Sequence, residues 1–308
     1  MEAEARVIVE RLRQAGFEAV YAGGCVRDRL LGLTPADYDI ATSASPDAVQ
    51  RLFPRTIPVG AHFGVIIVRQ GGEEFQVATF RSDGTYHDGR RPEGVTFSSA
   101  REDALRRDFT VNGMFFDPIG GEIIDYVNGQ QDLAARILRA IGNPADRFRE
   151  DRLRLLRAVR FAATYQLEIE PATWAALRAQ AAEIHVVSAE RIREELVRLL
   201  TSPARLRGFD LLDASGLLAQ ILPEVEALKG CEQPPQFHPE GDVFVHTRLM
   251  LELLRPDVSA PLVFAVLLHD IGKPPTQTVD ETGRIRFSGH DKVGAEMTRA
   301  IMERLRFS

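Results

Sequence analysis

The stretch Gly23-Gly24-Cys25-Val26-Arg27-Asp28-Arg29-Leu30-Leu31-Gly32 is followed, after four intervening residues, by Asp37-Tyr38-Asp39. A glycine pair before a predicted helix lets backbone N–H groups approach a phosphate, and Arg27 can clamp a triphosphate. Asp37 and Asp39 are two apart in a predicted strand, so their carboxylates project from one face. Such a pair can hold two Mg²⁺ ions that activate a hydroxyl and stabilise a leaving pyrophosphate. Taken alone, each motif is also compatible with an ordinary turn or a solvated strand end.

Together, the glycine pair, Arg27 and the two aspartates resemble the active-site motif of the tRNA nucleotidyltransferase and bacterial poly(A) polymerase family, within the DNA polymerase β-like superfamily. The resemblance extends over residues 5–225. It implies an α+β fold in which a head with a mixed sheet and helices precedes an all-α remainder. We expect a catalytic head at 1–138, a helical neck and body at 139–228, and an HD-like helical region at 229–308.

Composition narrows the class of protein before any motif is considered. The 308 residues are 44% hydrophobic and 27% charged, with a net charge of −6, which is typical of a globular protein and excludes general disorder. The N-terminus lacks the basic and apolar regions of a signal peptide, and the longest apolar run is too short to span a bilayer. Two cysteines provide no disulfide framework. We therefore expect a cytoplasmic protein.

Periodicity predicts the elements around the deciding stretch. Helical patterns cover 1–16 and 46–53, and alternation predicts a strand over 37–41. Two strands at 64–69 and 75–80 are joined by a glycine turn, and a hairpin covers 115–125. We expect one helix over 104–114. Beyond about residue 130, alanine, leucine and arginine dominate and strand patterns nearly vanish.

The segment 106–112 is similar to the family motif R-R-D-F-T-[IV]-N. The resemblance implies that it contacts the ribose and the triphosphate. A carboxylate can accept a hydrogen bond from a ribose hydroxyl, and a guanidinium can pair with phosphate. The nucleotide-binding residues expected here are Arg106, Arg107, Asp108 and Asn112, in addition to Gly24 and Arg27.

Glu150, Asp151 and Arg154 match the family motif E-D-x-x-R. The resemblance implies that Asp151 and Arg154 form the edge that selects CTP or ATP, because a carboxylate accepts and a guanidinium donates hydrogen bonds. We expect both on one helical turn. The resemblance also places Arg157 and Arg160 near the nucleotide, although Arg160 cannot share a helix face with Asp151.

Two further segments resemble segments that move in the enzymes of this family. The stretch 81–92 is similar to its flexible loop, which is implied to adapt the base pocket to ATP after CTP. The expected loop residues are Arg81, Asp83, Gly84, Tyr86, Arg90 and Arg91. Asp125 and Gly129 resemble its hinge between head and neck, where Gly129 would supply unusual backbone geometry.

One position departs from the family pattern. The family commonly has a third carboxylate in the strand before the loop, where this chain has Gln76. Glu74 lies on the same strand face and is a candidate replacement. We expect the metals on Asp37 and Asp39 to suffice, because a bound metal lowers the pKa of the attacking hydroxyl.

His246, His269 and Asp270 resemble an HD metal-dependent phosphohydrolase motif, and His290 is a further candidate ligand. A later aspartate ligand is not found before Ser308, so we expect this HD-like region to be incomplete. A purely structural or RNA-contacting role is as compatible with the sequence as an active hydrolase.

The leading hypothesis is a template-independent nucleotidyltransferase that uses CTP and ATP and Mg²⁺ to extend a tRNA 3′ end. The motifs leave open whether the product is CCA, a terminal A or poly(A). An HD-type phosphohydrolase is the alternative from another class.

Overall fold

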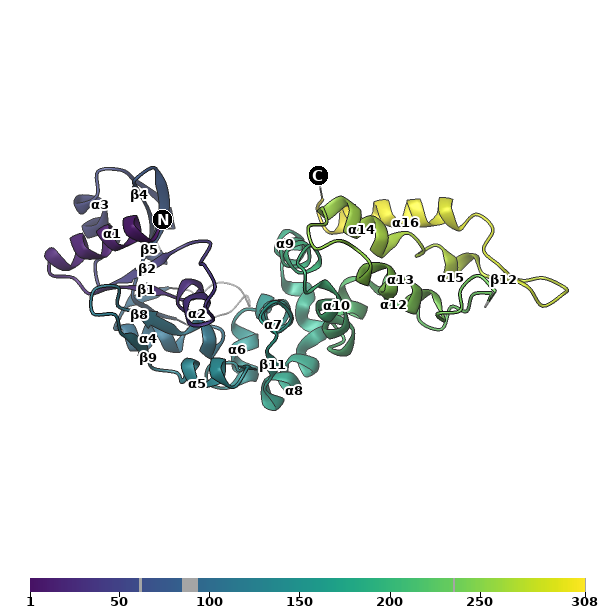
Figure 1. Cartoon of the computed structure of the whole chain (residues 1–308), viewed down its shortest axis with the longest axis horizontal. Helices are drawn as coiled ribbons and strands as arrows, with labels where there is room; N and C mark the ends of the chain where they lie inside the picture. The colour runs from purple at the N-terminus through teal and green to yellow at the C-terminus, as the bar shows by residue number, and fades with distance from the viewer. Residues whose placement is uncertain (61–62, 85–93, 235, 308) are drawn as a thin grey trace. The chain divides into compact units, whose positions relative to one another are not determined.

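The computed structural model describes residues 1–60, 63–84, 94–234 and 236–307. Its contacts divide the chain into two compact units, Met1–Glu150 and Asp151–Ser308. Figure 1 shows the first unit from purple to blue and the second from teal to yellow. Among the described residues, no helix is both long and apolar enough to cross a membrane.

The first unit is built on a mixed sheet. Its strand order is β3-β4-β5-β2-β1-β8-β9, and only β2 and β5 are parallel neighbours. The strands of the sheet are β1 (Ala19–Ala22), β2 (Asp39–Thr42), β3 (Thr56–Gly60), β4 (Val65–Gln70), β5 (Glu73–Thr79), β8 (Met114–Phe116) and β9 (Ile123–Asp125). Beside it, β6 (Arg81–Asp83) pairs with β7 (Val95–Phe97). This arrangement confirms the expected mixed sheet with helices.

Helices cover this sheet because their apolar stripes need burial. Ala5, Ile8, Val9 and Leu12 form the buried stripe of α1, which packs against the sheet and α3. The helical segments of the unit are α1 (Glu2–Gln14), α2 (Gly24–Leu30), α3 (Pro46–Leu52), α4 (Ala100–Leu105), η2 (Thr110–Asn112), α5 (Gly129–Ala134) and α6 (Pro144–Glu150), with a short strand β10 (Ile137–Leu138) before α6.

The expected single helix over 104–114 is wrong. The structure has α4 and then the short 3₁₀ turn η2, and Met114 begins β8. Ser99 explains the early start, since its side chain accepts a hydrogen bond from the Glu102 N–H in a capping box. The apolar residues after Leu105 are buried one by one in the unit's core rather than along a helix face. Strand β3 was not predicted.

The second unit is almost entirely helical. Its longer helices are α7 (Leu153–Thr164), α8 (Pro171–Gln180), α9 (Ala189–Leu200), α10 (Arg205–Ala214), α13 (Val243–Glu252), α14 (Ala260–Leu268) and α16 (His290–Arg304). Shorter elements complete it: β11 (Glu168–Ile169), η3 (Ala181–Val186), α11 (Leu217–Ile221), α12 (Pro223–Glu226), α15 (Lys273–Thr276), and the hairpin of β12 (Thr278–Val279) and β13 (Ile285–Arg286). Figure 1 labels most of these elements. The predicted loss of strand character after the head is confirmed.

Candidate active site

The turn between β1 and α2 brings the backbone close to a guanidinium. Gly23 has a φ of +72°, and a Cβ added there would lie 2.9 Å from Nη1 of Arg107. A side chain at this position would therefore be strained and would also displace Arg107. The glycine pair predicted from sequence thus has a structural reason at Gly23, and Gly24 is the first residue of α2.

Arg27 on α2 is held rigidly. Its side chain is buried, and Nη1 donates to Oδ1 of Asn112 at 2.5 Å. Its Nε and Nη2 donate to Oδ1 of Asp28 at 2.9 and 2.8 Å. The structure therefore brings Arg27 to Asn112, two residues that the sequence motifs placed 85 positions apart.

Asp103 organises both arginines of the second motif. Its carboxylate is 1% exposed and accepts from Arg106 at 2.6 Å through Oδ1 and from Arg107 at 2.9 Å through Oδ2. Burial opposes its charge, but the two guanidinium groups hold the pKa of Asp103 below its usual value. The sequence analysis missed Asp103, although an acid three and four residues before two arginines on a helix is a recognisable pattern.

Asp108 and Asn112 form a second pair. Oδ1 of Asp108 accepts from the Phe109 N–H at 2.8 Å and from Nδ2 of Asn112 at 3.0 Å. The Asn112 side chain is thereby oriented so that its oxygen meets Arg27. In this structure Asp108 positions Asn112, and its expected contact with a ribose stays a prediction.

Asp39 and Asp37 lie at the start of β2. Asp39 is its first residue, whereas Asp37 precedes the strand, so the expectation of one strand carrying both is wrong in detail. Burial and then the negative charge of Asp37 raise the pKa of Asp39 to about 6, while Arg107 lowers it. The two carboxylates and Arg107 therefore belong to one electrostatic centre.

The strand beside this pair provides no third carboxylate. Because Ile40 pairs with Val77 in parallel register, Gln76 is the neighbour of Asp39 on β5. Glu74 is exposed and forms an ion pair with Arg69 at 2.6 Å. Within the described residues, no group of three ligand atoms within 4.8 Å of one another includes Asp37 or Asp39. Glu74 does not replace the missing acid here.

The base of the predicted flexible loop is described, but its tip is not. The Gly84 N–H donates to the Gly94 carbonyl at 2.9 Å, and the Arg81 guanidinium donates to the Phe63 carbonyl. The Arg81 carbonyl in turn accepts from Nε of Arg106 at 3.1 Å. Tyr86, Arg90, Arg91 and the side chain of Asp83 lie outside the described residues.

The predicted hinge has a different geometry from the one expected. Asp125 accepts from the Val127 and Gly129 N–H groups through Oδ1 and thereby caps the start of α5. The left-handed backbone belongs to Asn128, with a φ of 62°, and not to Gly129. A Cβ at Gly129 would lie 2.3 Å from the Thr110 carbonyl oxygen, so this glycine is needed for close packing.

In the second unit, Asp151 precedes α7 rather than lying on it. Its Oδ1 accepts from the Leu153 N–H at 3.1 Å, which caps the helix. Arg191 of α9 donates to both carboxylate oxygens at 3.2 and 2.8 Å. Arg154, by contrast, is a buried residue of the first turn of α7. The Arg154 N–H donates to the Asp151 carbonyl at 3.0 Å, so both residues belong to the turn that leads into α7, although the helix itself begins at Leu153. Sequence reasoning missed Arg191.

The remaining residues of this motif are engaged within their own units. Glu150 accepts from Arg147 at 3.0 Å. Arg160 forms an ion pair with Glu195 of α9 at 2.6 Å, and the Arg157 guanidinium lies 5.0 Å from the centre of the Phe161 ring. Arg160 and Asp151 thus both contact α9, at Glu195 and Arg191, which are four residues apart on that helix. The expectation that Arg160 and Asp151 lie on different faces of their own helix stays a prediction.

The HD-like residues gather in the second unit. His246, His269 and Asp270 offer ligand atoms within 4.8 Å of one another, and so do His238, Glu240 and His246. Hydrogen bonds from the Glu240 backbone and from His238 and His246 lower the pKa of Glu240 to about 2. His290 belongs to neither group, since its Nδ1 meets the Phe287 carbonyl. His238 and Glu240 were missed, although they lie just upstream in a His-Pro-Glu stretch.

These features define a polymerase β-like nucleotidyltransferase head followed by a helical unit. Three family models match the chain: the poly A polymerase head domain at 19–139, the probable RNA and SrmB-binding site of polymerase A at 166–229, and the HD domain at 243–308.

A solved CCA-adding enzyme of Bacillus stearothermophilus, in complex with CTP, is 31% identical, with a TM-score of 0.67 over 99% of this chain and 81% of that one. The chain belongs to the CCA-adding enzyme family.

The curated relatives of this chain are also named CCA-adding enzymes. CCA-adding enzymes of Levilactobacillus brevis and Geobacillus stearothermophilus are 44% and 43% identical over 69% and 71% of this chain. The matches cover 54% of each relative, so the chain spans about half the length of these curated relatives. A Thermotoga maritima CCA-adding enzyme complexed with tRNA shares the fold, with a TM-score of 0.61 at 21% identity.

Proposed function

We propose that this protein adds C and A to the 3′ end of tRNA, using CTP and ATP and releasing pyrophosphate. The observation that carries the proposal is the centre at the start of β2, where the buried carboxylate of Asp39 interacts electrostatically with both Asp37 and Arg107. It occurs in a chain that belongs to the CCA-adding enzyme family, and the 31% identical relative was solved with CTP.

The arginines of the first unit bind the triphosphate. Arg27 and Arg107 are fixed by Asn112 and Asp103, so little side-chain entropy is lost when they meet phosphate oxygens. The backbone at Gly23 and Gly24 lets the phosphates approach Arg107 closely. The primer 3′ hydroxyl releases its proton to water, its oxygen forms a bond to the α-phosphorus, the bond from that phosphorus to the bridging oxygen breaks, and pyrophosphate leaves. Arg27 and Arg107 offset its negative charge.

Asp37 and Asp39 fit a hard divalent cation. Burial and then the negative charge of Asp37 raise the pKa of Asp39, so a cation held by the two carboxylates would relieve an unfavourable charge density. When bound, Mg²⁺ lowers the pKa of the attacking hydroxyl and neutralises triphosphate charge. The chain's own contribution is to hold two carboxylates beside the phosphate-binding arginines.

Base choice belongs to Asp151 and Arg154 in this proposal. The carboxylate supplies acceptors for an amino group, and the guanidinium supplies donors for ring acceptors, which favours cytosine and adenine over uracil and guanine. Arg191 supports this role, because it keeps the Asp151 carboxylate in one orientation. Glu150, Arg157 and Arg160 are proposed to contribute to nucleotide binding.

The proposed macromolecular partner is tRNA, recognised by shape and backbone charge. The match of residues 166–229 to an RNA-binding family model supports this assignment. We propose the cytoplasm as the location, since Cys25 and Cys231 are both free thiols. We also propose that the catalytic head ends at residue 138 and that the helical neck and body end at residue 228.

A primer-extension assay tests the function. Three tRNA transcripts, ending at the discriminator base, after one C and after CC, are each incubated with CTP, ATP or both in Mg²⁺. Growth of all three to CCA is the expected result. Addition of A only to the CC-ended transcript would redefine the protein as an A-adding enzyme, and long A tails would redefine it as a poly(A) polymerase. No extension of any transcript would overturn the proposal.

The histidine groups favour a second candidate activity, metal-dependent phosphate-ester hydrolysis in the second unit. His246, His269 and Asp270 provide a ligand set of the appropriate donor types. The test is divalent-metal-dependent release of phosphate from p-nitrophenyl phosphate. Release that disappears in His269→Ala supports the activity, and release unchanged in that variant rejects it.

A further inference from the structure

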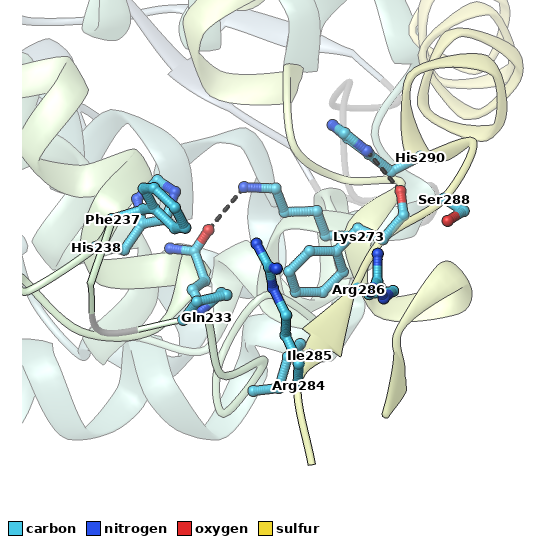
Figure 2. Close-up of a pocket in the computed structure, with 11 residues that line it drawn as sticks. Gln233, Phe237, His238, Lys273, Arg284, Ile285, Arg286, Ser288 and His290 are labelled. Atoms are coloured by element: carbon cyan, nitrogen blue, oxygen red, sulfur yellow. Dashed lines mark hydrogen bonds between the residues drawn. The ribbon is translucent and has the colours of Figure 1, made fainter. Parts of the chain in front are cut away.

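Buried carboxylates outside the proposed metal pair occur in both units. In the second unit, Asp270 pairs with Nζ of Lys273 at 2.8 Å, and the same Nζ donates to Oε1 of Gln233 at 2.6 Å (Figure 2). That carboxylate belongs to the histidine group described above. In the first unit, Asp132 of α5 is 6% exposed and belongs to none of the motifs found in the sequence. Because a buried carboxylate needs partners, its contacts show which segments it holds.

The Asp132 carboxylate joins three segments of the first unit. Its Oδ2 accepts from the Thr110 hydroxyl at 2.7 Å and from Nε of Arg139 at 3.0 Å, while its Oδ1 lies 3.2 Å from that Nε. The Thr110 N–H donates in turn to the Arg139 carbonyl at 3.0 Å. The three residues therefore form a closed ring of hydrogen bonds between α5, η2 and the segment after β10.

Close packing leaves η2 little room to move. The Thr110 carbonyl oxygen would lie 2.3 Å from a Cβ at Gly129, so α5 already touches the first residue of η2. In addition, Phe109 pairs with Ala140 in an isolated antiparallel bridge. Thr110 itself is 3% exposed. The position of η2 is therefore set by α5 and by the segment after β10, which the Asp132 carboxylate holds together.

The last residue of η2, Asn112, supports both arginines of the proposed triphosphate site. Its Oδ1 accepts from Nη1 of Arg27 at 2.5 Å, and its backbone carbonyl accepts from Nη1 of Arg107 at 3.3 Å. One residue thus fixes the spacing of two guanidinium groups that come from different segments of the chain. A displacement of η2 would move both groups, and a misplacement of about 1 Å can cost about a hundredfold in rate.

We propose that Asp132 is a positioning residue for nucleotide transfer, which holds Arg27 and Arg107 in place for the triphosphate by fixing η2 through Thr110. The inference rests on the proposed function and adds to it a residue that acts through others. The triphosphate is common to all nucleotides. Loss of the Asp132 contacts therefore lowers transfer of CTP, ATP and UTP by one factor and leaves the preference for CTP over UTP unchanged. A substitution at Asp151, by contrast, is expected to change that preference.

Steady-state incorporation into tRNA by single variants tests the proposal. Thr110→Val removes the hydroxyl whose hydrogen bond Asp132 accepts and keeps the size of the side chain, so kcat/KM for CTP and for ATP is expected to fall about tenfold each. Asp132→Ala is expected to lose at least as much. Thr110→Ser retains the hydroxyl and is expected to stay within about threefold of the wild type. The control is Gln131→Ala, because Gln131 is exposed and lies next to Asp132 on α5; its activity is expected to equal that of the wild type.

A double-mutant cycle separates positioning from a loss of folded protein. Unfolding lowers kcat/KM by the same factor in any background, whereas a positioning effect shrinks when the positioned group is absent. Thr110→Val is therefore expected to cost less than about threefold in the Arg27→Ala background, and urea denaturation is expected to show each variant folded under the assay conditions. The proposal is overturned by wild-type kcat/KM in Thr110→Val, by an equal loss in both backgrounds, or by a changed preference for CTP over UTP. A wild-type chain without any transfer would instead overturn the proposed function itself.

Discussion

Each unit contains a site that we propose to bind a divalent metal, and the pKa shifts of the aspartates at the two sites are opposite in direction. At Asp37 and Asp39, burial and like charge raise the pKa of Asp39 to about 6. In the histidine cluster, Asp270 is also buried, but hydrogen bonds from His269 and Lys273 lower its pKa to about 2. The charge of Arg107 does not compensate the burial and repulsion at Asp39, whereas hydrogen bonds from His269 and Lys273 do compensate the burial of Asp270.

The difference indicates how each centre is prepared for a ligand. In the first unit Arg106 and Arg107 donate hydrogen bonds to Asp103, and no hydrogen bond or ion pair given for the described residues joins them to Asp37 or Asp39. The carboxylates therefore remain available to an external cation. In the second unit, Lys273 contacts Asp270 directly, and a metal would have to compete with it. We therefore expect the first unit to depend more strongly on divalent metal.

Among substitutions outside the carboxylate pair, Arg27→Ala is predicted to produce the largest loss of activity in the first unit. The buried guanidinium is removed from the triphosphate site, and kcat/KM for CTP falls about thousandfold, or about 4 kcal/mol. Arg29→Ala is the control, since Arg29 lies two residues further on and forms an exposed ion pair with Glu2. Steady-state incorporation is measured for both. Equal activity of the two variants would exclude Arg27 from phosphate binding.

Asp151→Asn is predicted to act on selectivity more than on rate. The amide presents a donor where the carboxylate accepts, so the preference for CTP over UTP falls about a hundredfold. Asp146→Asn changes the same group on α6 at an exposed ion pair with Arg149 and preserves selectivity. The ratio of kcat/KM values for CTP and UTP is measured. An unchanged ratio in Asp151→Asn would remove that residue from base choice.

Asp103→Asn is predicted to destabilise the first unit by about 3 kcal/mol at pH 7, because two guanidinium groups lose their buried partner. The pKa of Asp103 in the folded protein lies below its usual value of 3.8. Its stabilisation is therefore present above that pH and is lost as the pH falls further.

Urea-dependent hydrogen exchange of peptides from 100–116 measures this effect. The difference between wild type and Asp103→Asn should be full at pH 7 and should shrink below about pH 4. Glu102→Gln provides the exposed control on the same helix. A difference that grows on acidification would contradict the assigned direction of the pKa shift.

Gln76→Glu is predicted to have the smallest effect. Asp37 and Asp39 are proposed to suffice, so turnover at neutral pH changes by less than about tenfold, or about 1.4 kcal/mol. Gln70→Glu at the end of β4 controls for added charge. A larger gain in Gln76→Glu alone would show that the chain lacks a functional third carboxylate.

The sequence predicted much of the first unit because its patterns are local. The strands β4 and β5 and the hairpin of β8 and β9 follow from alternation and glycine turns, and α1 follows from its apolar stripe. The segment 104–114 could not be predicted in this way. Its apolar residues are buried individually in the core, and a capping box moves the helix upstream.

In the candidate site, too, local sequence patterns could be predicted, whereas features that depend on tertiary contacts could not. Gly23 and Arg27 could be found because they lie in one turn and the helix that follows it, and Asp39 because it ends an Asp-x-Asp pattern at the start of a strand. Asp103 and Arg191 were missed because their importance comes from what they contact, Arg107 and Asp151 respectively. The sequence shows the charge of each residue, but it does not show which residues the fold brings together as an ion pair.

The central claim is that nucleotide transfer depends on the carboxylate pair of the first unit and not on the histidine cluster of the second. The direct measurement is CTP and ATP incorporation into tRNA by Asp39→Ala and His269→Ala, side by side and over a Mg²⁺ titration. The account predicts a loss of about thousandfold or more in Asp39→Ala and a change within about twofold in His269→Ala. Retained incorporation in Asp39→Ala together with its loss in His269→Ala would contradict the account.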